Sequence, residues 1–164
     1  MEEIIRMQKY LLLIRRTVGW TAEEFGEKIG VTRQTINNIE SGRNKLTKTQ
    51  YIAMRSVLDA EMIQSPDETD MLKVLLDVLV DHPEKYGSKD REELLSKANL
   101  MAPSILAGAT SRANVSKEWM HTVGMVAGIG ALIGPVVGGV GMTVVNTWLI
   151  KAIHGGKDKP RKEF

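Results

Sequence analysis

The sequence predicts an all-α fold, with an N-terminal bundle of four helices, then further helices and a glycine-rich apolar helical hairpin. Two observations support this prediction. Apolar residues recur three and four positions apart through most of the chain, which is the spacing of one helix face. Serine or threonine precedes several of these segments and glycine or proline follows them, as expected for helix starts and stops.

The most distinctive stretch, residues 19–46, has the pattern of two short helices joined by a tight turn. Thr21 can cap the first of them, because its hydroxyl can accept a hydrogen bond from a free N–H of the first turn. Phe25 and Ile29 then lie four residues apart on one face. Gly30 can adopt the positive φ that a helix C-terminus often needs.

The second short helix is expected over residues 33–40, with Thr32 as its cap and Gly42 after its end. Ile36 and Ile39 are predicted to face inward, since they share one side of this helix. The polar residues face outward: Arg33, Gln34, Asn37 and Asn38. This helix therefore carries an apolar face for the core and a polar face for a partner.

Helices on either side complete the bundle. A first helix is expected over residues 4–18, with Leu11 and Ile14 in the core. Leu12 and Leu13 would point elsewhere, either against later helices of the same chain or into a dimer contact. A fourth helix is expected over residues 48–60, capped by Thr47.

This pattern resembles the helix-turn-helix of the Cro and lambda-repressor type, often called XRE-like, over about residues 11–58. The matching residues occur in order: Leu11, Ile14 and Arg15, then Gly19-Trp20-Thr21, Glu24-Phe25, Gly30-Val31-Thr32, and Ile36, Ile39, Glu40 and Gly42. Two positions depart from the family pattern. Ala22 stands where the family often has a glutamine that braces a phosphate, and Arg55 stands where a small apolar residue is usual.

The resemblance implies a set of DNA contacts, with the second short helix in the major groove. The residues expected to read bases are Arg33, Gln34, Thr35, Asn37 and Asn38. The residues expected to contact phosphates are Thr21, Arg43, Asn44, Lys45 and Lys48. Arg15 and Glu40 stand where the family often has an ion pair between the first and third helices. A single module has a small footprint, so a homodimer or higher oligomer on double-stranded DNA is expected.

Composition restricts the other functions. The chain has 164 residues, enough for one ordinary domain or two small ones. Its formal charge is +2, so the sequence as a whole has no large basic field. The absence of cysteine excludes thiolate catalysis and cysteine-based metal sites. The three histidines are far apart, and no nucleophile elbow or phosphate loop is present. We therefore expect no enzyme activity, no metal, no cofactor and no small-molecule substrate.

Residues 65–114 are expected to form a helical linker or self-association region. Ser65-Pro66 resembles a helix start, with Glu68 completing a capping box, and the helix would end at His82-Pro83. A second helix is expected over residues 89–101, opened by Ser88 and ended before Pro103. Residues 103–114 are expected to be a short helix or a linker.

Residues 115–154 form a glycine-rich apolar segment, in which a helix capped by Ser116 leads into 28 uncharged residues, 123–150. Glycines at helix-packing spacing are Gly124, Gly128, Gly130, Gly134 and Gly138. Trp119 and Trp148 lie near the two ends of this apolar segment, where interfacial aromatic residues are expected. One straight helix would be about 42 Å long, more than the roughly 30 Å hydrocarbon core, so a break is expected at Gly134-Pro135. Three arrangements of this segment remain open: a membrane hairpin, a single membrane pass, and a hairpin buried within the protein.

These observations predict four regions: a DNA-binding domain at 1–62, the linker at 65–114, the apolar segment at 115–154 and a basic tail at 155–164. The favoured function is a dimeric, sequence-specific DNA-binding transcriptional regulator, with a membrane tether left open. Because the start of the chain does not resemble a signal peptide, a cytoplasmic location is expected, with the cytoplasmic face of the inner membrane left open. The alternative is a membrane-associated interaction or pore-type protein whose helix-turn-helix does not bind DNA.

Overall fold

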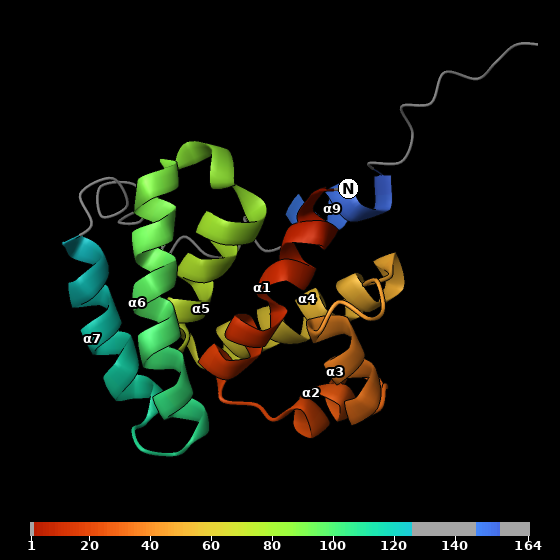
Figure 1. Ribbon diagram of the computed structural model, residues 1–164, viewed down its shortest axis with the longest axis horizontal. Helices are drawn as coiled ribbons and strands as arrows, with labels where there is room; N and C mark the ends of the chain where they lie inside the picture. Colours follow the sequence, from red (N-terminus) through yellow and green to blue (C-terminus); the bar gives the residue numbers. More distant parts are fainter. Residues whose placement is uncertain (1, 126–146, 155–164) are drawn as a thin grey trace, which may run out of the picture.

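The structure is a computed structural model that describes residues 2–125 and 147–154. Within these ranges the chain forms eight α-helices and no strand (Figure 1). The N-terminal helices are α1 (Glu2–Val18), α2 (Ala22–Ile29), α3 (Arg33–Glu40) and α4 (Lys48–Gln64). The later elements are η1 (Pro66–Glu68), α5 (Asp70–Leu75), the π-helical η2 (Leu76–Asp81), η3 (Pro83–Lys85), α6 (Ser88–Leu106), α7 (Arg112–Gly124) and α9 (Thr147–His154).

The caps predicted for the helix-turn-helix are present. Thr21, Thr32 and Thr47 cap α2, α3 and α4, and each side chain accepts a hydrogen bond from the N–H three residues later. Gly30 ends α2 with a φ of +75°, a conformation that a residue with a Cβ rarely adopts. Local chemistry thus determines the ends of these short helices.

α1 is the central element of the fold. In Figure 1 it lies between α2–α4 on one side and α5–α7 on the other, and it contacts α3, α4, α5, η2 and α6. A single hydrophobic core includes Phe25 of the N-terminal bundle together with Leu72 and Trp119 of the later helices. The core is therefore continuous across residues 62–65. Leu13 is buried in it, whereas Leu12 remains exposed.

The start of the first helix in the C-terminal half differs from the prediction. The Ser65 side chain makes no capping hydrogen bond, residues 66–68 form a turn of 3-10 helix, and α5 begins only at Asp70. The predicted capping box at Ser65 is therefore wrong. The Thr69 hydroxyl instead donates to the Ser65 carbonyl oxygen at 2.9 Å, which holds the chain in the tighter turn.

α6 is longer than predicted, because Pro103 lies within it instead of following its end. A proline in a helix leaves the carbonyl four residues earlier without its N–H partner. That carbonyl belongs to Asn99, and both Asn99 and Pro103 are exposed, so water can take the place of the missing donor.

The start of the next helix also differs. Ser111, not Ser116, caps α7, and its hydroxyl accepts from the Asn114 N–H. The Ser116 hydroxyl is buried and bonds to the Asp70 carboxylate at 3.1 Å. The two serines carry similar local signals, and the contact with Asp70 distinguishes them.

Arg55, the second departure from the family pattern, has a partner outside the N-terminal bundle. Its guanidinium bonds to both carboxylate oxygens of Asp81, at 3.1 and 3.0 Å, and its side chain is only 4% exposed. The pair joins α4 to the end of η2. A charged residue is therefore accommodated at this position because the C-terminal half supplies the opposite charge.

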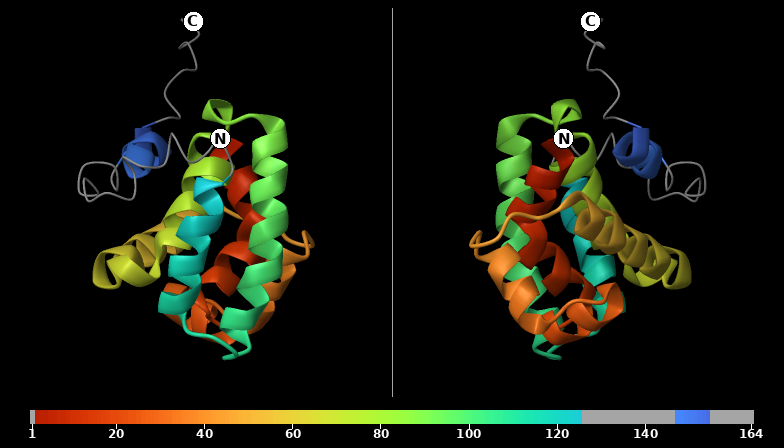
Figure 2. Two further views of the ribbon diagram at one scale, coloured as in Figure 1. Left: turned by 90° about the vertical axis from the view of Figure 1, so that its left-hand side faces the viewer. Right: turned by 90° about the vertical axis from the view of Figure 1, so that its right-hand side faces the viewer.

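The two tryptophans expected at a membrane interface lie inside the protein instead. Trp119 of α7 is fully buried, and Trp148 of α9 is 9% exposed. The Trp148 N–H donates to the Asp59 carboxylate, and its ring meets the edge of Tyr51 with centroids 5.8 Å apart. Figure 2 shows α9 on the same side of the molecule as α4. The interfacial assignment is therefore wrong for both residues.

Most of the predicted apolar hairpin lies outside the described residues. This holds for Gly128, Gly130, Gly134 and Gly138, and for the break expected at Gly134-Pro135. Gly124 is described, and a Cβ at this position would meet no atom of the described residues within 4 Å. None of the helices in the described ranges is long and apolar enough to cross a membrane.

The contact between α4 and α9 predicts a pH dependence of stability. Burial raises the pKa of Asp59 from about 4 to about 6, although the nearby Arg55 opposes the shift. Because this carboxyl holds its proton more tightly when folded, its contribution to stability should be largest below about pH 4 and fall as the pH rises to about 6. Asp59→Asn should remove this component, because the titrating carboxyl is gone. The contact with α9 is kept, since the amide oxygen can still accept from Trp148.

Thermal unfolding between pH 4 and pH 8 would measure this effect. The difference in Tm between Asp59→Asn and the unchanged protein should grow in favour of the variant as the pH rises through 4–6. Asp81, whose pKa burial also raises, contributes to the profiles of both proteins. Parallel profiles would contradict the prediction.

Candidate nucleic-acid interface

α3 has the two faces that a DNA-reading helix requires. Ile36 and Ile39 are buried in the core, which fixes how the helix lies on the bundle. Arg33 and Gln34 on the opposite side are exposed. The three other predicted base-reading residues are half-buried at the edges of this face: Thr35, Asn37 and Asn38. The structure thus places all five along one short helix.

Hydrogen bonds order part of this face in the free protein. The Gln34 amide donates to the Asn38 side-chain oxygen at 3.0 Å, across one helical turn. The Thr35 hydroxyl lies 3.0 Å from the hydroxyl of the cap Thr32. Gln34 and Asn38 are consequently a coupled pair, whereas Thr35 is part of the helix start.

The loop between α3 and α4 gathers positive charge. Arg43, Asn44, Lys45 and Lys48 are all exposed there. Within the described part of the chain, neither these three cations nor Arg33 forms an ion pair. The N-terminus of α4 adds backbone N–H groups beside them, and such a combination suits phosphate oxygens.

Gln8 of α1 holds this loop in place, a role that sequence reasoning missed. Its amide nitrogen donates to the carbonyl oxygens of Ile39 at 2.9 Å and Asn44 at 2.7 Å. Its amide oxygen accepts from the Leu46 N–H at 2.9 Å. One side chain from another helix therefore fixes both ends of the loop. A single polar residue in a helix gives no local signal of such a role.

We expect Gln8→Ala to weaken binding to all DNA sequences alike, by about 1 kcal/mol, because three hydrogen bonds to the loop are lost. Fluorescence anisotropy with one specific and one random duplex would measure this. Gln64→Ala is the matched control, since Gln64 is an exposed glutamine at the end of α4. A loss confined to the specific duplex would contradict the positioning role of Gln8.

The start of α2 supplies a second candidate phosphate contact. The Thr21 hydroxyl accepts from the Glu24 N–H at 3.1 Å, and the Glu24 carboxylate accepts from the Thr21 N–H at 2.7 Å. This backbone hydrogen bond lowers the pKa of Glu24. The Thr21 hydroxyl proton can still be donated to a phosphate, because the cap uses only its oxygen.

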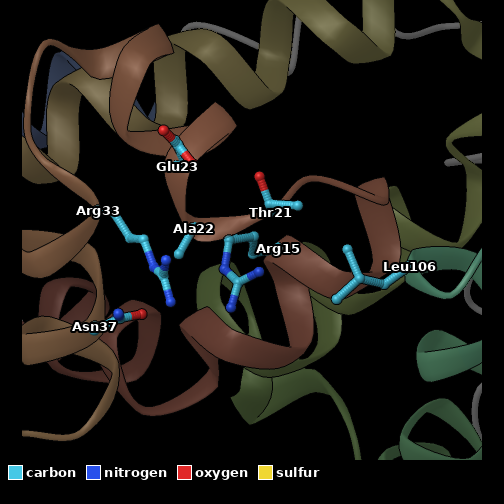
Figure 3. A pocket seen from close by; sticks show the side chains of 7 residues that line it. All are labelled: Arg15, Thr21, Ala22, Glu23, Arg33, Asn37 and Leu106. Atoms are coloured by element: carbon cyan, nitrogen blue, oxygen red, sulfur yellow. The ribbon is translucent and has the colours of Figure 1, made fainter.

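An open hollow of about 370 Å³ is lined by residues of α1, the start of α2, α3 and α6 (Figure 3). Its lining residues are Arg15, Thr21, Ala22, Glu23, Arg33, Asn37 and Leu106. Ala22 belongs to the hollow, so the missing family glutamine leaves space where a long side chain would extend. Among the described lining residues, Glu23 alone carries a carboxylate, which would oppose a phosphate. Leu106 comes from α6, which the predicted helix-turn-helix does not include.

Arg15 and Glu40 form a buried ion pair beneath this surface. The guanidinium bonds to both carboxylate oxygens at 2.6 and 3.0 Å and donates to the Trp20 carbonyl oxygen at 2.8 Å. The two side chains are only 7% and 8% exposed. The pair joins α1, the turn before α2 and the end of α3, and so fixes the orientation of the reading helix.

Comparison with known proteins agrees with this geometry. A family model described as Helix-turn-helix matches residues 11–62. No curated protein and no solved structure matches the chain. Residues 11–62 are thus a helix-turn-helix domain of the Cro/C1 or XRE type, as the resemblance implied.

A domain of this type suggests a DNA-binding transcriptional regulator. Within residues 2–125 and 147–154, no group of three or more histidine, aspartate or glutamate side chains is arranged to hold a metal ion.

Proposed function

We propose that the protein is a sequence-specific DNA-binding transcriptional regulator that inserts α3 into the major groove. The observation that carries this proposal is the polar face of α3, flanked by the exposed cations of the α3–α4 loop, which form no ion pair with the described residues. The helix-turn-helix match over residues 11–62 supports the same function.

Each residue has a role in this proposal. Arg33 pairs with O6 and N7 of a guanine, which is the commonest specific contact in the major groove. Gln34 and Asn38 read an adenine together, since their side chains already bond to each other. Asn37 contacts a base or the backbone beside Arg33, and Thr35 stabilises the helix start. Contacts to phosphates come from Thr21, Arg43, Asn44, Lys45 and Lys48.

Two extensions of the proposal rest on the sequence. A homodimer on a two-fold site would supply the affinity that one small module lacks. A membrane tether through residues 123–150 is the second extension, and carbonate-washed membrane fractions of the full chain would test it. Protein found wholly in the supernatant would exclude the tether.

A salt-dependent gel shift on DNA from upstream of the protein's own gene tests the main proposal. Two modules with three loop cations each predict a slope of about −5 for log K against log salt. If the protein shifted the upstream DNA no more strongly than random DNA, sequence-specific binding would be contradicted.

A further inference from the structure

The turn between α6 and α7, residues 107–111, lies beside the proposed DNA-binding surface. Leu106, immediately before this turn, lines the same hollow as Arg33 and Asn37 of α3. Figure 3 shows Leu106 on the side of the hollow opposite to Arg33 and Asn37. An element outside the helix-turn-helix thus forms one wall of the space that faces the reading helix.

Contacts hold this turn firmly against the turn between α1 and α2. Arg112 donates to the Val18 carbonyl oxygen at 3.3 Å and to the Glu61 carboxylate at 2.6 Å. It also bonds to Glu68 at 2.8 Å. On the other side of the turn, a Cβ at Gly19 would lie only 3.2 Å from the Ile105 side chain. Through the flanking residues Ile105 and Arg112, the α6–α7 turn is therefore held next to the turn between α1 and α2.

The turn has the chemistry of a surface that approaches phosphates closely. Its sequence is Ala-Gly-Ala-Thr-Ser, with no charge and only small side chains, and four of the five residues are exposed. The nearby carboxylates of Glu61 and Glu68 are paired with Arg112. Small residues let a phosphate come near the backbone, and hydroxyl and N–H groups can donate to its oxygens.

We propose that residues 107–111 form a second DNA contact, against the sugar–phosphate backbone that borders the major groove occupied by α3. This inference rests on the proposed function. A helix in the roughly 12 Å wide major groove has a backbone strand on each side. The α3–α4 loop faces one strand, and the α6–α7 turn, across the hollow from α3, faces the other.

Single cysteines offer a direct test, because the chain has none of its own. Ala109→Cys would place a tethered iron–EDTA chelate on the exposed turn. Ser41→Cys would place it at the end of α3, next to the phosphate-binding loop. Ser88→Cys at the far end of α6, about 27 Å from Leu106 at about 1.5 Å per residue, is the distant control.

Ala109→Cys is expected to cut DNA on the flank opposite to the cuts from Ser41→Cys, and Ser88→Cys is expected to leave the DNA intact. If Ser41→Cys cuts and Ala109→Cys does not, the contact at residues 107–111 is refuted while the proposed function stands. Equal cutting from Ser88→Cys would also refute it. If none of the three cuts, the proposed function itself fails, and the inference fails with it.

A gain of binding gives an independent test that does not depend on cutting. Ala109→Lys should steepen the dependence of log K on log salt by about 0.9 for each copy bound, as one added phosphate contact predicts. Ser88→Lys adds the same charge at the far end of α6 and should leave the slope unchanged. Equal slopes for the two lysine variants would overturn the proposal.

Discussion

Replacing Arg15 with alanine is expected to lower the free energy of unfolding by about 3–5 kcal/mol, the largest effect of any single substitution proposed. The reason is the buried Glu40, which would lose both hydrogen bonds from the guanidinium. An unpaired carboxylate inside a protein is costly because water no longer solvates it. Since small domains are stable by only about 5–15 kcal/mol, Arg15→Ala should bring the protein close to unfolding at ambient temperature.

Urea denaturation followed by circular dichroism measures this loss. Arg16→Ala is the matched control, because Arg16 is adjacent and forms no ion pair within the described residues, so a change within about 0.5 kcal/mol is expected. Replacing Arg15 and Glu40 together with methionine should recover most of the stability, since no buried charge would remain. A double variant as unstable as Arg15→Ala would show that the pair is not the source of the loss.

Arg33→Ala is expected to have the largest effect on recognition, about 1–3 kcal/mol for the specific site and little for random DNA. The exposed guanidinium lies on the face of α3 that points into the groove in our proposal. Lys45→Ala should instead weaken both kinds of complex equally and reduce the salt slope by about 1 for each copy, as a phosphate contact would.

Competition binding at one fixed salt concentration distinguishes the two roles. Lys89→Ala, at the exposed start of α6, removes one positive charge away from the interface and should change neither complex. If Arg33→Ala and Lys45→Ala both lost the same affinity on specific and random DNA, the division between reading and positioning residues would be wrong.

The N-terminal bundle was predictable because its signals are local. The three threonine caps and the positive φ at Gly30 each depend on residues within one helical turn. The inward positions of Ile36 and Ile39 follow directly from helical spacing. The family pattern, matched in register, then predicts how these helices pack together.

The remaining features depend on contacts between distant parts of the chain. Gln8 reaches Leu46 across 38 positions, and Arg55 pairs with Asp81 across 26. Trp148 is buried because α9 returns to Asp59, 89 positions away in the sequence. Periodicity reports which face of a helix is apolar, not which element covers it, so these partners were not predictable.

The same reasoning explains the errors at the helix starts. Ser65, Ser88 and Ser116 all resemble caps, but none of their side chains caps its helix. The Ser116 hydroxyl bonds to Asp70, a residue of another helix. Ser111 and Ser116 give equivalent local signals, and the contact with Asp70 distinguishes them.

Selection of bound sequences from a randomised duplex library, at one fixed salt concentration, tests the central claim that α3 reads DNA. The full chain is expected to enrich one motif that contains a guanine, and Arg33→Ala to lose enrichment at that guanine while it keeps the adenine read by Gln34 and Asn38. Absence of any enriched motif, or a motif that Arg33→Ala leaves unchanged, would contradict the assignment of α3 as the reading helix.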